Sequence, residues 1–264
     1  MDEDDGQPLQ VASPPLEFRI GGQLVFAQTS KLLDPRRTVY RLELKQPLFL
    51  PLIQFFATCC PRIRTYYPGW FLPPIIILKK RKVGWEDEFD REKQVYEVLK
   101  PLQGTVIPYL YGEGVYDGSP ALVLSFIRGK TVYELLREGR LPEDKDLEAL
   151  RNSLEDALRA LTGYGVEYTD MKTDNFLLTD DGRATVVDLE QAELNRANVW
   201  EGSTNSANVE HLMYQLREPR RLALRRSPGQ GLLPIPSAAK GRLVHYHTST
   251  TKREMELFGG GGSG

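Results

Sequence analysis

Two carboxylates and one side-chain amide follow one another closely between residues 165 and 190, and their types suit a metal ion with bound phosphate. These residues are Asp170, Asn175 and Asp188. Asn175 precedes the apolar run Phe-Leu-Leu, Asp188 follows the run Ala-Thr-Val-Val, and Asp181-Gly182 lies between the two runs. This pattern predicts a β-hairpin with Asn175 and Asp188 at the same end of neighbouring strands. Such oxygen ligands favour Mg²⁺, which takes one or two carboxylates together with substrate phosphates.

A lysine and a glutamate earlier in the chain are predicted to form an ion pair. Residues 75–78 predict a buried strand, and Lys79 and Lys80 follow it on opposite faces because side chains alternate along a strand. Residues 85–100 predict a helix with Glu92 on its apolar face. A buried carboxylate is costly without a partner, so we expect Glu92 to pair with Lys79. The alternative is that Glu92 lies at the edge of the apolar stripe and is solvated.

Two helices are predicted to bring the chain to Asp170. Thr131 and Glu134 form a capping box, which predicts the start of a short helix. Leucines at helical spacing over residues 142–162 then predict a long amphipathic helix that ends near Gly163. These leucines are Leu147, Leu150, Leu154, Leu158 and Leu161.

Strands are predicted at both ends of the first half of the chain. Residues 16–20 and 23–28 are strand-like, with Gly21-Gly22 as the turn between them. Residues 38–44 predict a further strand after a loop at 29–37, and residues 121–126 predict a buried strand.

The order and spacing of the polar residues resemble the protein-kinase-like fold. Its catalytic loop reads His-Arg-Asp-x-x-x-x-Asn, and its metal-binding strand ends in Asp-Phe-Gly. Asp170 and Asn175 match the loop, and Asp188 matches the second motif. Tyr168-Thr169 replace His-Arg, and Leu189-Glu190 replace Phe-Gly. The run from 187 to 192 is similar to a group of fungal kinase-like proteins, and its Asp-Leu-Glu is similar to small-molecule phosphotransferases.

This resemblance implies a nucleotide site in the first half of the chain, with ATP and Mg²⁺ as cofactors. Lys79 would contact the nucleotide phosphates, and Glu92 would orient Lys79. The adenine would be held where the strand at 121–126 ends. The residues implied there are Leu124, in the gatekeeper position, Ser125, Phe126 and Ile127.

The resemblance also implies roles for four residues of the second half. Asn175 and Asp188 would bind Mg²⁺. Asp170 would accept or orient the proton of an acceptor hydroxyl, and Lys172 would stabilise the transferring phosphoryl group.

The implied fold is α+β and two-lobed, with an antiparallel-sheet N-lobe carrying one helix and a reduced, mainly helical C-lobe. The N-lobe would cover residues 16–126 with an insertion at 45–74, and the C-lobe residues 127–258. Residues 1–15 are acidic and Pro-rich and are expected to be disordered, and 259–264 read as an engineered linker.

Two departures from the family pattern leave a second function open. The loop at 29–37 contains no glycine, although Lys31, Arg36 and Arg37 could contact phosphate by charge or could simply be solvated. No Ala-Pro-Glu segment follows Asp188. The residues that match the family favour a phosphotransferase that moves the γ-phosphate of ATP to a hydroxyl of a protein or small molecule. The departures favour the alternative, a pseudokinase that acts as a binding or scaffold module.

Composition narrows the expected partners and location. A net charge of −2 gives no reason to expect nucleic acid. The adjacent Cys59 and Cys60 fit neither zinc spacing nor a structural disulfide, so we expect a reducing, intracellular and cytoplasmic setting. The acidic residues 1–5 do not resemble a secretory signal. The apolar segment 45–74 is too broken by proline and charge to span a membrane, and it either packs on the N-lobe or binds a protein partner.

Overall fold

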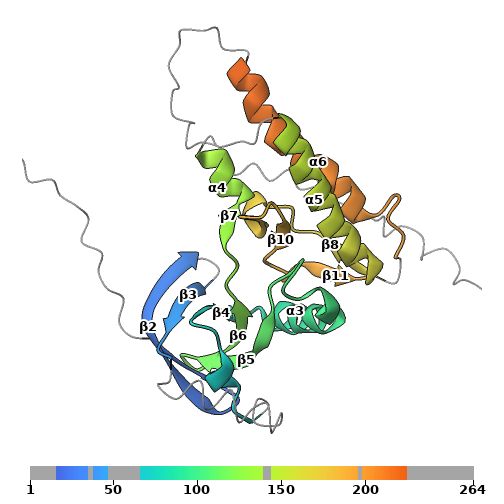
Figure 1. Ribbon diagram of the computed structural model, residues 1–264. Coiled ribbons are helices and arrows are strands. Elements are labelled where there is room, and N and C mark those ends of the chain that lie inside the picture. Colours follow the sequence, from blue (N-terminus) through green and yellow to red (C-terminus); the bar gives the residue numbers. More distant parts are fainter. Residues whose placement is uncertain (1–15, 35–37, 47–65, 139–143, 196–197, 225–264) are drawn as a thin grey trace, which may run out of the picture. The chain divides into compact units, whose positions relative to one another are not determined.

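The computed structural model describes residues 16–34, 38–46, 66–138, 144–195 and 198–224 (Figure 1). Those up to Arg221 belong to one unit of the chain. They form a mixed α+β structure with antiparallel strands, as predicted. Within these ranges, no helix is long and apolar enough to cross a membrane. The predictions for 1–15, most of the segment 45–74, and 259–264 fall outside the described residues.

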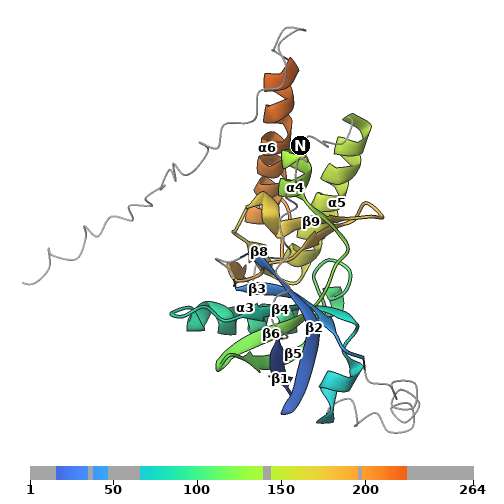
Figure 2. The ribbon, with the colours of Figure 1, turned by 90° about the vertical axis from the view of Figure 1, so that its left-hand side faces the viewer.

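Six antiparallel strands form a closed barrel in the order β1-β2-β3-β4-β6-β5. Its members are β1 (Glu17–Ile20), β2 (Gln23–Asp34), β3 (Val39–Leu44), β4 (Ile75–Lys80), β5 (Leu110–Tyr116) and β6 (Ser119–Ser125). β1 closes the barrel because it pairs with β2 on one side and with β5 on the other (Figure 2). Closure satisfies the backbone groups that an open edge would expose.

The predicted turn between the first two strands is confirmed. Gly21 and Gly22 have φ of +54° and +78°, the left-handed values that a two-residue hairpin needs and that glycine adopts without strain. A second turn of this kind, at Asp117-Gly118, connects β5 and β6.

The predicted loop at 29–37 is wrong over most of its length, because β2 continues to Asp34. Lys31, predicted in that loop, lies in β2 opposite Arg41 of β3. Irregular register near Ala27 and near Leu32 lets the strand bend and continue, and no proline interrupts it before Pro35. Arg36 and Arg37 lie outside the described residues.

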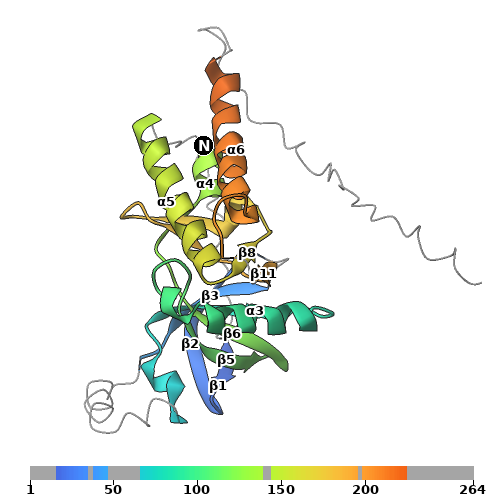
Figure 3. The same ribbon diagram turned by 90° about the vertical axis from the view of Figure 1, so that its right-hand side faces the viewer.

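Two hydrophobic clusters form the interior. The smaller fills the barrel and includes Phe18, Leu42 and Ile76. The larger joins the outer face of β6 to α3 (Glu86–Val98) and to the helices that follow in the chain. Figure 3 shows α3 running beside the barrel strands, next to β8 and β11. One continuous core therefore fixes α3 against both halves of the chain.

The described part of the second half consists of three helices and several short strands. The helices are α4 (Val132–Arg137), α5 (Asp144–Gly163) and α6 (Thr204–Leu224), and the short strands are β7 (Gly129–Thr131), β8 (Val166–Tyr168), β9 (Phe176–Thr179), β10 (Ala184–Val186) and β11 (Ala192–Leu194). Single 3-10 turns occur at η1 (Pro68–Phe71), η2 (Lys100–Leu102) and η3 (Thr173–Asn175).

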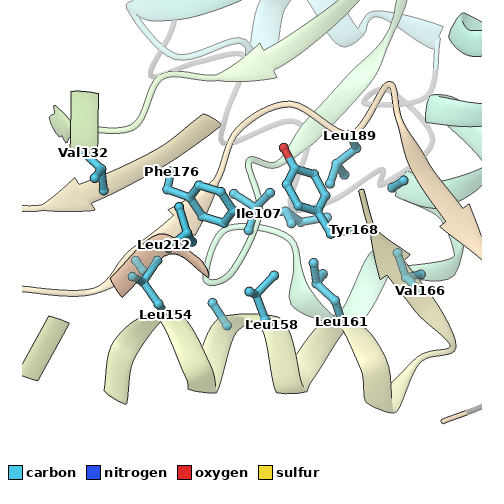
Figure 4. Packing of buried hydrophobic residues seen from close by; sticks show 14 of the residues in the cluster. Ile107, Val132, Leu154, Leu158, Leu161, Val166, Tyr168, Phe176, Leu189 and Leu212 are labelled. Atoms are coloured by element: carbon cyan, nitrogen blue, oxygen red, sulfur yellow. The ribbon is translucent and has the colours of Figure 1, made fainter. Parts of the chain in front are cut away.

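The predicted helix starts and core positions are confirmed. Thr131 and Glu134 form the capping box of α4, with both reciprocal hydrogen bonds present. All five leucines of the predicted stripe on α5 are buried. Figure 4 shows Leu154, Leu158 and Leu161 pointing from one helix into the same core as Tyr168 and Phe176.

A buried asparagine on α6 fixes the backbone of β8 just before Asp170. The Asn205 side chain is fully buried, and its Oδ1 accepts a hydrogen bond from the Tyr168 N–H at 2.8 Å. Its Nδ2 donates to the Val166 carbonyl and the Thr162 hydroxyl, both at 2.8 Å. Asn208, also on α6, donates to the Tyr168 carbonyl at 2.6 Å. Both backbone polar groups of Tyr168 are thus held by α6.

Replacing this asparagine should destabilise the fold. Asn205→Ala leaves the buried Tyr168 N–H and Val166 carbonyl without these partners, so we expect a loss of about 2–4 kcal/mol in the free energy of unfolding, measured by urea titration. Asn152→Ala, an exposed position on α5, is the matched control and should change stability little. Equal effects of the two substitutions would contradict the role assigned to Asn205.

Candidate functional site

A buried ammonium group lies where β4, α3 and the segment after β10 meet. The Lys79 Nζ lies 2.7 and 2.8 Å from the two Glu92 oxygens, 2.8 Å from Asp188 Oδ1 and 3.2 Å from Glu190 Oε1. Lys79 is only 4% exposed and Glu92 is fully buried. The predicted ion pair between Lys79 and Glu92 is confirmed, and Asp188 and Glu190 join it.

The strand geometry predicted for the lysine pair is also confirmed. Lys80 points away from this cluster and binds Asp117 at 2.6 Å, with Asp117 largely exposed. Alternation along β4 therefore sends one lysine into the ion cluster and the next to the surface.

Burial and charge act in opposite directions on the cluster. Burial raises the pKa of the Glu92 carboxyl from 4.5 to about 7, against the attraction of Lys79, and the negative charge of Asp188 adds to the rise. Burial alone would lower the pKa of the Lys79 ammonium, but attraction by Asp188, Glu92 and Glu190 holds it well above its usual range. Lys79 therefore stays charged, and the Glu92 carboxyl, with a pKa of about 7, titrates near neutral pH.

A second group of predicted residues lies on the loop between β8 and β9. The Asp170 carboxylate accepts a hydrogen bond from Asn175 Nδ2 at 2.9 Å, and it forms an ion pair with Lys172 Nζ at 2.9 Å. Asn175 is fully buried, whereas the Lys172 side chain is 55% exposed. The buried Asn175 amide thus holds the Asp170 carboxylate, and the exposed side chain of Lys172 lies beside it.

The predicted hairpin joins the two groups. β9 and β10 are antiparallel, with Phe176 opposite Val186. Beyond the last pair, the Val187 N–H donates to the Asn175 carbonyl at 3.0 Å. Asn175 and the residue before Asp188 are therefore direct backbone neighbours, which is the arrangement that the Asp-Gly turn predicted.

A cavity of about 740 Å³ lies against the first group, at Lys79 and Asp188. Lys79 and Asp188 line it together with Leu124, Ser125, Phe126 and Ile127, the predicted strand end. Its apolar walls come from Leu33, Val39, Ile77, Leu124, Leu177 and Val187. This volume and mixture of apolar walls with a few charged groups are typical of small-molecule sites.

The strand end at β6 is itself fixed. The Ser125 N–H donates to the Tyr109 carbonyl at 2.8 Å, and the Ser125 hydroxyl accepts from the Tyr109 N–H at 2.9 Å. The Arg41 guanidinium lies 5.0 Å from the centre of the Phe126 ring. Because Tyr109 already occupies the Ser125 N–H, a ligand at this strand end would have to meet the backbone of Phe126 or Ile127.

The oxygen donors present suit a hard divalent cation. Carboxylate oxygens of Glu92, Asp188 and Glu190 lie within 4.8 Å of one another among the described residues. Of these three carboxylates, Asp188 is the one that also lines the cavity, and its Oδ1 binds Lys79 at 2.8 Å. Asn175 would add its amide oxygen, because its nitrogen donates to Asp170. Carboxylate and amide oxygens are ligands that Mg²⁺ accepts.

Three residues of the site were not predicted. Glu190 contacts Lys79, and it also binds Lys82 at 2.6 Å. Asn205 positions the start of the Asp170 loop. Glu190 stands in the sequence only as the residue replacing glycine in the family motif, and no local pattern indicates that Lys82 or Asn205 contacts residues more than 35 positions away.

Comparison with known proteins finds partial similarity to protein kinases. No protein-family model matches the chain. Over 112 residues, 42% of the chain, it is 28% identical to ribosomal protein S6 kinase alpha-2 of Mus musculus, of which this stretch covers 15%. Over 113 residues it is 29% identical to serine/threonine-protein kinase PknL of Mycobacterium tuberculosis, covering 28% of that protein. The chain thus spans well under a third of the curated relatives it matches, and the similarity indicates a kinase-like protein.

The raised pKa of Glu92 predicts an unusual pH dependence of stability. Its pKa is higher in the folded state than the ordinary 4.5, so the folded state binds more protons between that value and about 7, and stability is lost as pH rises through this window. Glu92→Gln removes the titrating group. We expect the wild type to lose on the order of 2 kcal/mol relative to this variant between about pH 5 and pH 8, measured by urea titration with a chelator present. Glu97→Gln, exposed on the same helix, is the control. Parallel pH profiles for wild type and Glu92→Gln would refute the assignment.

Proposed function

We propose that the protein is an ATP- and Mg²⁺-dependent phosphotransferase with the two-lobed architecture of the protein-kinase-like class. The observation that carries the proposal is the Lys79 ammonium, fixed by Glu92 and Asp188 and lining an apolar-walled cavity. A buried lysine oriented by a glutamate is the device by which such enzymes hold nucleotide phosphates. The partial similarity to ribosomal protein S6 kinase alpha-2 and to serine/threonine-protein kinase PknL supports the same class.

The cavity provides for both ends of a nucleotide. Its apolar walls, including Val39, Leu124 and Leu177, would bury the base by the hydrophobic effect. The backbone at Phe126 and Ile127 would supply hydrogen bonds to the base. The phosphates would lie toward Lys79, a buried cation that lines the same cavity.

Asp188 and Asn175 would hold the magnesium ion. When bound, Mg²⁺ would neutralise the charge of the nucleotide phosphates. The protein contributes to this by fixing both ligands: Asp188 through Lys79 at 2.8 Å, and Asn175 through the Asp170 carboxylate at 2.9 Å. These contacts already restrict the rotation of both side chains, so less conformational entropy would be lost when the ion binds.

Asp170 would orient the acceptor hydroxyl and accept its proton. Asn175 and Lys172 hold its carboxylate in place, so the base needs no rearrangement before transfer. The exposed Lys172 would stabilise the charge on the transferring phosphoryl group. Removing the hydroxyl proton as the oxygen attacks leaves the proton on Asp170.

The acceptor is proposed as a hydroxyl of a protein or a small molecule. One relative is named as a kinase of ribosomal protein S6 and the other as a serine/threonine-protein kinase, which favours a protein hydroxyl. The Asp-Leu-Glu at 188–190 and its resemblance to fungal kinase-like proteins and small-molecule phosphotransferases keep the second class in view. An intracellular setting and a protein partner at 45–74 remain part of the proposal.

A pseudokinase is the second candidate, and two observations favour it. Three carboxylates already surround Lys79, and the connection between β2 and β3 contains no glycine to bring backbone amides to a phosphate. Such a protein would bind nucleotide weakly or without turnover and would act through a partner.

Nucleotide binding should raise thermal stability. A ligand that binds only the folded state stabilises it by about 2.7 kcal/mol at one hundred times its dissociation constant. We expect millimolar ATP with Mg²⁺ to raise the melting temperature of the wild type, and Lys79→Met and Asp188→Asn to abolish the rise.

The neighbouring lysine provides the control. Lys80→Met removes a charge of the same kind from the other face of β4, so the ATP-dependent shift should persist. A wild type that shows no shift, or a shift that Lys79→Met retains, would refute the nucleotide site.

Transfer should depend on Asp170 more than binding does. We expect Asp170→Asn to lower the rate of phosphate release from ATP by about 10²–10⁴-fold, the usual contribution of a general base. The ATP-dependent melting shift should remain, because Asp170 does not line the cavity. Asp180→Asn, exposed in the β9–β10 turn, is the matched control. ATP binding without measurable release in the wild type would favour the pseudokinase.

A further inference from the structure

Glu190 bridges two lysines at the edge of the ion cluster. One oxygen, Oε1, lies 3.2 Å from Lys79 Nζ, and the other, Oε2, lies 2.6 Å from Lys82 Nζ. Lys82 also lies 4.4 Å from the centre of the Trp85 ring, which limits where its ammonium can move. Neither Glu190 nor Lys82 lines the cavity, so Glu190 approaches Lys79 from outside it.

The coordination of Lys79 is already complete. An ammonium group has three N–H donors. Those of Lys79 donate to both Glu92 oxygens and to Asp188 Oδ1, and Glu190 adds an ion pair at 3.2 Å. A phosphate that approaches Lys79 must therefore compete with these carboxylates for its charge. The longest of the three contacts is that of Glu190, at 3.2 Å against 2.7 and 2.8 Å for the others.

Glu190 is also the carboxylate that can leave at least cost. Glu92 is fully buried and has no other lysine nearby among its contacts. Asp188 is buried and its Oδ1 also accepts the Glu190 N–H at 3.2 Å. Glu190 keeps a short ion pair with Lys82 when it releases Lys79, so its charge stays compensated.

We propose that Glu190 is an internal competitor for the nucleotide phosphates at Lys79, and that Lys82 sets how strongly it competes. The inference rests on the proposed nucleotide site and concerns how tightly that site binds. A phosphate that approaches Lys79 competes with the Glu190 carboxylate for its charge, and Lys82 retains Glu190 when that contact is lost. The glutamate that replaces glycine in the family motif thus tunes affinity.

Substitutions of the two residues should act in opposite directions. Glu190→Gln removes the competing charge, so the dissociation constant for ATP with Mg²⁺ should fall about tenfold, the change expected from a difference of one buried ion-pair contact. Lys82→Met leaves Glu190 with Lys79 alone, so the dissociation constant should rise about fivefold. In the double variant the competitor is absent, and affinity should equal that of Glu190→Gln.

The measurement is isothermal titration of each purified full chain with ATP and Mg²⁺. Glu193→Gln and Lys100→Met make the same charge changes at exposed positions outside the cluster and should leave the dissociation constant unchanged. Glu190→Asp keeps the charge but shortens its reach, and it should also tighten binding if Glu190→Gln proves unstable. A purely structural role would not give effects of opposite sign that merge in the double variant.

The outcomes separate the two proposals. ATP binding with equal affinity in wild type and Glu190→Gln overturns the competitor role and leaves the nucleotide site standing. Absence of ATP binding in wild type and Glu190→Gln alike overturns both.

Discussion

The pairing of one buried ammonium group governs the arrangement of the site. Lys79 comes from β4, Glu92 from α3, and Asp188 and Glu190 from the segment after β10, so three separate parts of the chain meet at one charge. A buried ion without its partners costs several kcal/mol, which ties the positions of these elements to one another. The same contacts connect the barrel to the helical half of the chain, and they place Lys79 and Asp188 on a shared cavity.

A second constraint acts on the backbone rather than on charge. Asn205 and Asn208 of α6 bind the N–H and the carbonyl of Tyr168, and the chain then turns directly into the loop that carries Asp170. The β9–β10 hairpin extends this fixed frame to Asn175 and Asp188. Polar groups satisfied inside the core therefore hold both clusters of site residues on one rigid support, which is what positional catalysis requires.

The carboxylates of the ion cluster both support and oppose the proposed binding of phosphate at Lys79. Carboxylates keep Lys79 charged and fixed, yet the same carboxylates compete with any phosphate that approaches it. A glycine-rich loop would add neutral backbone donors that carry no such cost, but the sequence between β2 and β3 contains no glycine. The affinity of the proposed site for nucleotide would thus depend more on the balance of charges around Lys79 than on backbone N–H donors.

Features that depend on near neighbours in the chain were predictable from the residues alone. The Asp-Gly hairpin, the leucine stripe of α5 and the capping box of α4 follow from short-range spacing, and the pair of Lys79 with Glu92 follows from the cost of burying a lone carboxylate. Closure of the barrel by β1, the extent of β2, and the contacts of Glu190 and Asn205 were not predictable in this way. Glu190 meets Lys82 across 108 positions, and Asn205 meets Tyr168 across 37. Such contacts leave no periodic or local signal, because they exist only once packing has brought distant segments together.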